Sequence, residues 1–218
     1  MSGDAKTAPD TAAARYEEYL RTRPKQSRSR GVVDAILTAT REALSRGERE
    51  DRITLQWVAE RAGVGIGSLY DYFGDRASVL AGLTAKLTDD NLRELEAELA
   101  TTDTMALEPA LTHLIDVIFE KYVPNPTLGR AILRVAHRID LMPMLAENQT
   151  LFSKTLAAAF RRRSDLRLDD ADLTAWTLTQ TTMGVIHTMV WSGALPFSQD
   201  RLKAELVQMY LARLAPTK

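Results

Sequence analysis

The sequence predicts an all-α protein, and three observations support this class. Apolar residues recur at the helical spacing i, i+3, i+4 and i+7 along most of the chain. Glycine and proline separate these periodic segments at several points, among them Gly47, Gly63 and Pro124. The second half of the chain reads as helices and shows no strand-like alternation. We therefore expect about nine helices, arranged as an N-terminal three-helix helix-turn-helix domain and a larger C-terminal helical domain.

The length of the chain limits the size of these domains, and its net charge limits the kind of surface they can present. The chain has 218 residues, 45% of them hydrophobic, which is enough for a real core. We place a flexible basic arm at residues 1–26, the helix-turn-helix domain at 27–83 and the second helical domain at 84–218. The formal net charge of −1 argues against a uniformly basic nucleic-acid coat, although it allows one basic face.

Other classes of protein find little support in the composition. The chain has no cysteine, which excludes a disulfide framework and a thiolate metal site. The segment Met1–Asp10 lacks the apolar core of a signal peptide, and no run of about 18 apolar residues could cross a membrane. We expect a soluble cytoplasmic protein that makes no membrane contact.

The first 26 residues form an arm with more basic than acidic side chains. Residues 1–9 are small and polar and are expected to be disordered. Asp10–Arg23 could form a short extra helix, which Pro24 would end. The basic side chains leave two interpretations open: an arm that follows the DNA backbone or minor groove, and a solvated linker. These side chains are Arg21, Arg23, Lys25, Arg28 and Arg30.

The segment Ser27–Arg46 is the first expected helix of the N-terminal domain, and Gly47 ends it. Its inner face is formed by Val32, Val33, Ile36, Leu37, Thr40 and Leu44. The following loop contains Glu48, Glu50 and Asp51, and an acidic loop fits a DNA-binding domain only if it points away from the DNA.

Two short helices joined by a tight turn follow. Thr54 is suited to cap the helix Leu55–Ala62, and Gly63 stands where a helix ends in a left-handed residue. The second short helix covers Ile66–Phe73 and has the size of a helix that enters a DNA major groove. Spacing alone leaves open an ordinary corner between two helices of a bundle.

Residue identities favour the first interpretation. The stretch Val58–Arg76, VAERAGVGIGSLYDYFGDR, resembles the DNA-binding domain of TetR-family transcriptional regulators. The matching features are an Ala-x-x-Ala-Gly-Val turn, a Gly-Ser-Leu-Tyr segment in the second helix, and Tyr-x-Phe before a basic residue. The resemblance covers about Ser27–Leu83, whereas the rest of the chain is similar to the family only in length and helical character.

The resemblance implies which residues contact DNA. Thr54 would hold a phosphate, Gln56 would reach the bases, and Arg76 takes the place of the usual lysine. The N-terminal side chains of the second helix are small or apolar, so Ile66 could touch a thymine methyl group. Tyr70 and Tyr72 would reach the backbone, although core packing is the alternative for either one. The expected DNA-contacting residues are Thr54, Gln56, Gly65, Ile66, Gly67, Ser68, Tyr70, Tyr72 and Arg76.

A long helix over Asp75–Leu99 would join the domains, since its 25 or so residues span about 37 Å. Five more helices are expected after it. At the end of the third of these, Arg161-Arg162-Arg163 suits either the helix dipole or a second DNA patch. The expected ranges are Thr104–Tyr122 (with Asp103 as another possible cap), Thr127–Ile139, Pro143–Arg163, Asp169–Trp191 and Ser198–Leu214.

The helix Asp169–Trp191 carries two faces of different character. Large side chains on one face suit a mostly apolar pocket for a small molecule, and plain core packing is an equal alternative. Small side chains on the other face suit a symmetric contact between two subunits. We expect the ligand to contact Phe119, Tyr122, Phe152, Trp176, Gln180 and Met183. We expect the dimer interface to include Thr181, Gly184, Thr188, Leu202, Leu206 and Met209.

Catalytic and metal-binding patterns are weak. His113, Asp116 and Glu120 share a helix face, but a solvated face explains them better than a metal site. We expect no catalytic residue, metal or cofactor. The resemblance implies a homodimer that binds a palindromic operator in double-stranded DNA and is released by a small, mostly apolar effector. The alternatives are a ligand-binding helical dimer that no longer reads DNA and, more remotely, an enzyme.

Overall fold

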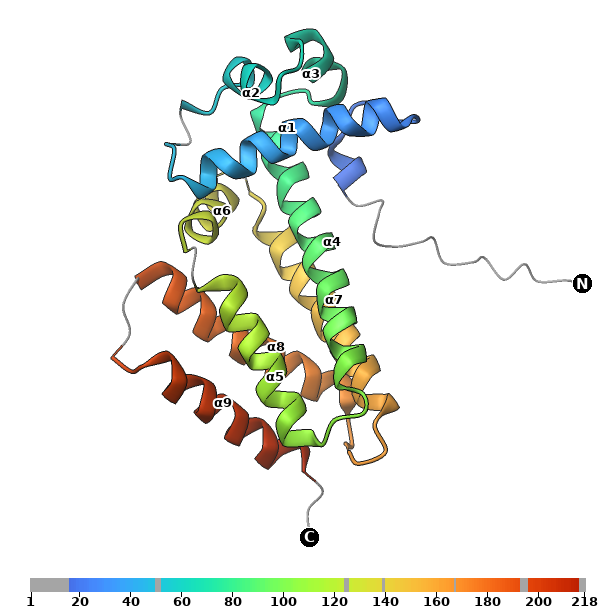
Figure 1. Ribbon diagram of the computed structural model, residues 1–218, viewed down its shortest axis with the longest axis vertical. Coiled ribbons are helices and arrows are strands. Elements are labelled where there is room, and N and C mark those ends of the chain that lie inside the picture. The colour runs from blue at the N-terminus through green and yellow to red at the C-terminus, as the bar shows by residue number, and fades with distance from the viewer. Residues whose placement is uncertain are drawn as a thin grey trace, which may run out of the picture. The chain divides into compact units, whose positions relative to one another are not determined.

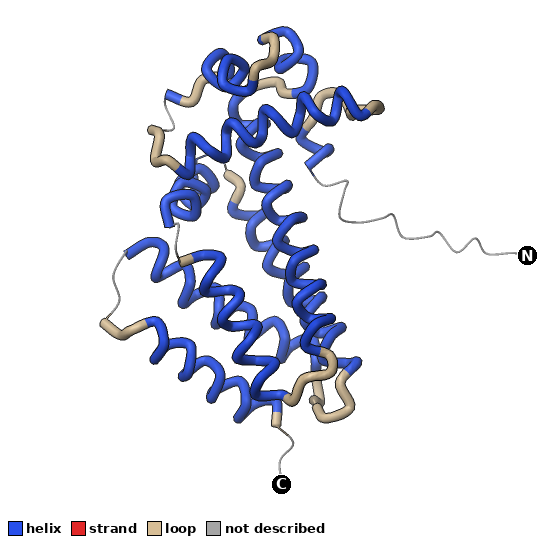
Figure 2. The backbone as a smooth tube through the Cα atoms, viewed as in Figure 1, coloured by secondary structure: helices blue, strands red, loops and turns tan. Residues whose placement is uncertain are grey.

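The computed structural model describes residues 16–49, 52–123, 126–138, 140–166, 168–192 and 196–215. Within these ranges the chain forms nine α-helices and one short 3-10 helix, with no strand, which confirms the all-α class (Figure 2). The chain divides into two compact units after Arg93. This division and the expected domain boundary after Leu83 both fall within one long helix, α4 (Arg76–Thr102).

The first unit contains the expected helix-turn-helix elements. They are η1 (Tyr16–Tyr19), α1 (Ser27–Ser45), α2 (Leu55–Ala62), α3 (Ile66–Tyr72) and the first part of α4. The extra helix expected over residues 10–23 is reduced to the single turn η1, and residues 10–15 lie outside the described ranges. Glu50 and Asp51 of the acidic loop lie outside them as well.

The core of this unit forms where α1 packs on both α2 and α3 (Figure 1). The expected inner face of α1 is buried at Val33, Ile36, Leu37, Thr40 and Leu44, while Val32 is half-buried. Burial of the Thr40 hydroxyl is tolerated because it donates to the Ile36 carbonyl at 2.9 Å. Leu69 and Phe73 complete the core from the α3 side.

Local hydrogen bonds fix the helix ends around α2 and α3. The Thr54 hydroxyl accepts from the Trp57 amide at 3.2 Å, as its expected capping role requires. Gly63 has φ 65°, the left-handed conformation that a glycine reaches without strain. Asp75 caps α4, since its Oδ1 accepts from the Ser78 amide at 2.7 Å. The turn between α2 and α3 is therefore determined by local chemistry.

The second unit consists of the end of α4 and five further helices. These are α5 (Leu107–Tyr122), α6 (Pro126–Arg138), α7 (Met142–Arg162), α8 (Ala171–Ser192) and α9 (Gln199–Leu214). The helix α8 packs on α7 and α6, and α9 packs on α5 (Figure 1). The close approach of α6 and α8 depends on Gly129, where an added Cβ would lie 3.0 Å from Val190 Cγ1.

Two boundaries of the α-helices differ from the expected ones by three residues, and the others differ by at most two. The helix α4 continues to Thr102, whose hydroxyl donates back to the Leu99 carbonyl at 2.9 Å. Residues 103–106 then form the turn, so neither Asp103 nor Thr104 caps α5, which begins at Leu107 after Ala106. Helix-forming residues continue up to Thr102, and the apolar periodicity alone gave no sign of where they would stop.

The arginine triplet at the end of α7 is paired within the second unit. Arg161 forms an ion pair with Asp172, and Arg162 lies 3.3 Å from an Asp103 oxygen. Arg163 donates to the Asp165 carboxylate at 2.7 Å and to the carbonyl oxygens of Thr102 and Met105. The hydrogen bond from Arg163 to the Asp165 carboxylate lowers the pKa of Asp165. The pairing favours a structural role for all three arginines over a second DNA patch.

Candidate nucleic-acid interface and the helical second unit

The helix α3 turns most of its side chains away from the rest of the first unit. Only Leu69 is fully buried, and it anchors the helix to the core. Gly65, Gly67, Ser68 and Tyr70 are exposed, and Ile66 is half-buried. Tyr70 is 47% exposed and therefore does not pack in the core, whereas Tyr72 is half-buried.

The two glycines at the start of α3 are not needed for packing within the described chain. A Cβ added at Gly67 would meet no atom within 4 Å, and one at Gly65 would only reach Ser68 Oγ at 4.0 Å. Neither glycine has the left-handed φ that requires the residue. The open space above both positions allows a close approach from outside the protein.

Two of the expected contact residues on and before α2 are exposed but already engaged. Gln56 Nε2 donates to Glu60 Oε1 at 2.8 Å, one turn along the same helix. The Thr54 hydroxyl accepts from the Trp57 amide but keeps its own hydrogen to donate. Gln56 keeps its second amide hydrogen and its Oε1 acceptor for a contact with a base.

Arg76 opens α4 close to the end of α3. Its side chain is half-buried, and Nε is buried with no hydrogen-bond partner among the described residues. The guanidinium is permanently charged, and its terminal Nη groups, in contrast to the buried Nε, are the donors suited to an anionic acceptor from outside. Its place in the first turn of a helix adds the positive end of the helix dipole.

The helix α8 buries a third face, on the side opposite to the two neighbouring faces that we singled out from its sequence. The buried residues are Thr174, Ala175, Leu178, Thr182, Ile186, Met189 and Val190. Leu173, Trp176 and Trp191 stay exposed, at 59%, 48% and 58%. Trp176 therefore lies at the surface of its subunit and not in an enclosed pocket.

The expected ligand-binding residues do not converge as a set. Phe119 is buried in the core of the second unit, and Tyr122 and Met183 pack against the same cluster. Burial raises the pKa of Tyr122 to about 12. Phe152 and Gln180 are half-buried and lie outside this cluster. The structure thus brings together three of the six residues.

The expected dimer residues fall into exposed, half-buried and buried positions. Gly184, Thr188 and Met209 are exposed, and Thr181 and Leu202 are half-buried. Leu206 is 3% exposed and belongs to the core of its own subunit, so it is not accessible to a partner. A Cβ at Gly184 would meet no atom within 4 Å, so packing inside the subunit does not require glycine there.

Hydrogen bonds between α8 and α9 were missed at the sequence level. Tyr210 is buried, and its hydroxyl donates to the Leu178 carbonyl at 3.1 Å and lies 2.6 Å from Thr182 Oγ1. Arg213 Nη2 donates to Thr174 Oγ1 at 2.9 Å. Tyr210 and Arg213 thus both bind within their own subunit. The residue spacing did not predict these hydrogen bonds, because threonine occurs both at buried polar contacts and at the surface.

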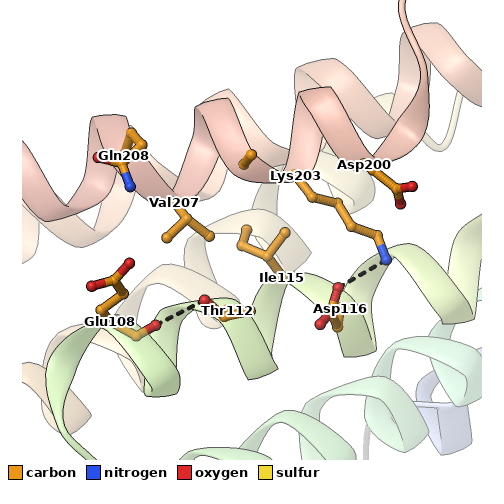
Figure 3. A pocket seen from close by; sticks show the side chains of 9 residues that line it. Glu108, Thr112, Ile115, Asp116, Asp200, Lys203, Val207 and Gln208 are labelled. Atoms are coloured by element: carbon orange, nitrogen blue, oxygen red, sulfur yellow. Dashed lines mark hydrogen bonds and ion pairs between the residues drawn. The ribbon is translucent and has the colours of Figure 1, made fainter.

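A surface groove of about 310 Å³ lies between α5 and α9 (Figure 3). None of the expected ligand-binding residues lines it. Lys203 Nζ donates to Asp116 Oδ1 at 2.8 Å across the groove. His113 Nε2 instead lies 2.6 Å from Glu98 Oε2, so His113 and Asp116 have separate partners and are not arranged around a shared ion. The lining residues are Glu108, Thr112, Ile115, Asp116, Asp200, Lys203, Ala204, Val207 and Gln208.

These features define a class of protein: a helix-turn-helix unit followed by an independent helical unit, as in DNA-binding transcriptional regulators. The family model described as "Tetracyclin repressor-like, C-terminal domain" matches residues 106–214, half of the chain. The chain belongs to the TetR family of DNA-binding transcriptional regulators, which are not enzymes.

Solved structures support the fold. A TetR-family regulator from Mesorhizobium loti matches with a TM-score of 0.73 at 18% identity, covering 88% of this chain and all 100% of that one. A TetR regulator from Haloarcula marismortui gives 0.63 at 18% identity, covering 85% and 98%. The complex of SmeT with triclosan gives 0.61 at 22% identity, covering 85% and 92%. No curated protein sequence matches the chain.

None of the helices in the described part of the chain is both long enough and apolar enough to cross a bilayer.

Proposed function

We propose that this regulator is a repressor that binds a palindromic operator as a homodimer and leaves it when a small, mostly apolar molecule binds the second unit. The observation that carries the DNA-binding part is the outward face of α3. Its two glycines face open space and Ser68 is exposed, while Leu69 is the fully buried residue of the helix. A helix presented in this way can enter a major groove without rearrangement.

The recognition chemistry follows from the side chains on that face. Ile66 is suited to a thymine methyl group, and the glycines let the backbone approach the bases closely. Arg76 and Thr54 would bind phosphates, and Tyr70 and Tyr72 the backbone. The remaining proposed contacts are Gln56, Gly65, Gly67 and Ser68. Phosphate contacts supply affinity and register, so few direct base contacts suffice for a specific complex.

The exposed apolar residues of α8 and α9 support the dimer. Leu173, Trp176 and Met209 are each about half exposed, and large apolar side chains left in contact with water gain free energy when a partner covers them. A twofold dimer would present two α3 helices to successive major grooves, about 34–36 Å apart. The palindromic operator follows from that symmetry.

Two observations support the proposal that an effector releases the protein from DNA. They are the continuity of α4 and the complex of the structurally similar repressor SmeT with triclosan. Because α4 is one unbroken helix from Arg76 to Thr102, movement at its end can reach the residue that we assign to a phosphate. SmeT is the repressor of the Stenotrophomonas maltophilia multidrug efflux pump SmeDEF and has been solved with triclosan. An apolar effector of that kind, close to Phe119, Tyr122 and Met183, would need a coupling of only about 1–3 kcal/mol to weaken DNA binding 5–150-fold.

The test begins with the intergenic DNA beside the gene, searched for an inverted repeat. Fluorescence anisotropy with that DNA should give an affinity that falls steeply with salt and exceeds the affinity for a scrambled sequence by about 10³-fold or more. Equal affinity for both sequences would contradict specific operator binding and favour a helical dimer that no longer reads DNA.

A further inference from the structure

Residues 16–26, which we call the N-terminal strap, pack against the unit that contains α3 (Figure 1, dark blue). The strap begins with the turn η1 and ends where α1 starts. Pro24 is buried although both of its neighbours are exposed. The Gln26 amide then donates to Ser29 Oγ at 3.0 Å and leads into α1. Packing of this kind distinguishes the strap from a solvated linker.

The strap is anchored at its start by Tyr16. The Lys86 ammonium lies 5.7 Å from the centroid of the Tyr16 ring, within the range of a cation–π contact. Lys86 also lies 3.4 Å from an Asp34 oxygen, which links the strap to α1 and α4. Burial, together with the carboxylate of Glu17, raises the pKa of Tyr16. The strap is thus held at its N-terminal end, before the residue that contacts α3.

Arg21 connects the strap to the end of α3. Its backbone amide donates to the carbonyl of Tyr72, the last residue of the helix, at 2.8 Å. The last carbonyls of a helix have no partner inside the helix. In a helix of only seven residues, such a contact constrains a large part of the element. The strap therefore caps α3 from outside.

The side chain of Arg21 makes a second contact just beyond this helix. A Cβ added at Gly74 would lie 2.9 Å from Arg21 Nε and 3.2 Å from Nη2. Gly74 does not have a left-handed φ, so the backbone conformation does not demand glycine. A side chain at this position would displace the guanidinium from its present place. Arg21 thus packs on the link between α3 and α4.

We propose that the N-terminal strap positions α3 for DNA binding and that Arg21 is the positioning residue. The strap supports the helix from the protein side, and Arg21 itself does not bind a phosphate. This proposal rests on the DNA-binding function proposed above. It differs from both interpretations of the basic arm, because the backbone amide and the guanidinium of Arg21 both contact the protein itself.

The first test compares two arginine variants of the full chain. Arg21→Ala removes the guanidinium that packs on Gly74 but keeps the backbone hydrogen bond to Tyr72, and it should weaken operator binding by about two- to tenfold with an unchanged salt slope. Arg23→Ala removes the same charge two residues away, from a side chain that is 70% exposed, and should change affinity less than twofold. A salt slope reduced by about one unit in Arg21→Ala would show a direct phosphate contact and overturn the proposal. Equal affinities of the two variants would overturn it as well.

Gly74→Ala tests the same contact from the other side. The added methyl group should displace the guanidinium and weaken operator binding in the otherwise unchanged protein. In the Arg21→Ala background it should have no further effect, because the side chain it displaces is gone. Equal losses in both backgrounds would mean that Gly74 acts without Arg21, and the proposal would fail.

Hydrogen exchange of the free protein separates this proposal from the DNA-binding function. The Phe73 amide donates to the Leu69 carbonyl at 2.8 Å in the last turn of α3. Its exchange should become faster in Arg21→Ala and stay unchanged in Arg23→Ala. Unchanged exchange in both variants would overturn the strap proposal even if the protein binds its operator. Failure of the unaltered protein to bind DNA would instead contradict the function.

Discussion

The helices α3 and α8 both present a face that nothing in the described chain covers, but the chemistry of the two faces differs. The outward residues of α3 are glycine, serine and tyrosine, and they leave open space for a close approach. The outward residues of α8 include Leu173, Trp176 and Trp191, each about half exposed or more. A small, polar face suits the groove and phosphates of DNA, whereas an apolar face gains free energy by excluding water.

The comparison also shows two uses of glycine. At Gly67 the missing side chain leaves space for a partner, because no atom of the described chain lies within 4 Å of an added Cβ. At Gly129 it serves internal packing, because Val190 would be 3.0 Å away. Exposed glycines in a helix lower its stability, so their presence in α3 indicates a benefit gained elsewhere.

The largest expected effect comes from placing a charge on the apolar face of α8. Trp176→Glu should weaken the dimer by about 2–4 kcal/mol, since a buried tryptophan is typical of the residues that dominate interfaces. Analytical ultracentrifugation over a concentration series measures this change, and operator affinity should fall in parallel. Met142→Glu is the matched control, because Met142 is exposed but lies on α7. If Trp176→Glu remains as dimeric as the control, the face of α8 is not the interface.

An intermediate effect is expected at the junction of α3 and α4. Arg76→Ala should weaken binding to all DNA sequences alike, by about 1–2 kcal/mol, and reduce the salt slope by about one unit. Its oligomeric state should stay unchanged, which separates the DNA-binding face from the face of α8. Arg46→Ala serves as control, because Arg46 already pairs with Glu42 at 3.1 Å. An unaltered salt slope in Arg76→Ala would remove Arg76 from the phosphate contacts.

The smallest effect sharpens the comparison of the glycines. Gly67→Ala should raise the free energy of unfolding by about 0.5–1 kcal/mol, because alanine favours the helix and meets no neighbour. Operator affinity should fall at the same time, since the methyl group occupies space meant for DNA. Gly129→Ala should instead destabilise the protein through contact with Val190. Thermal denaturation and anisotropy measure the two effects, and a Gly67→Ala protein with full affinity would argue against close approach at this position.

The strap illustrates how far local patterns reach. Pro24 was expected to end a helix over residues 10–23, but within the described part of this segment the helical turn already stops at Tyr19. That Arg21 approaches Gly74 could not be read from spacing, because the contact joins residues more than 50 positions apart in the sequence. The positions of basic residues in a sequence do not indicate whether these side chains contact phosphates, solvent or the protein itself.

The sequence by itself determined the helical class and the turn at Gly63 with its cap at Thr54. Each depends on interactions within a few residues, which local patterns encode. The tertiary structure decided which face of α8 is buried, that Leu206 and Tyr210 belong to their own subunit, and that the arginines after Phe160 are paired. A helix with apolar or small residues on most of its circumference has no single preferred inner face, so the neighbours that pack against it make the choice.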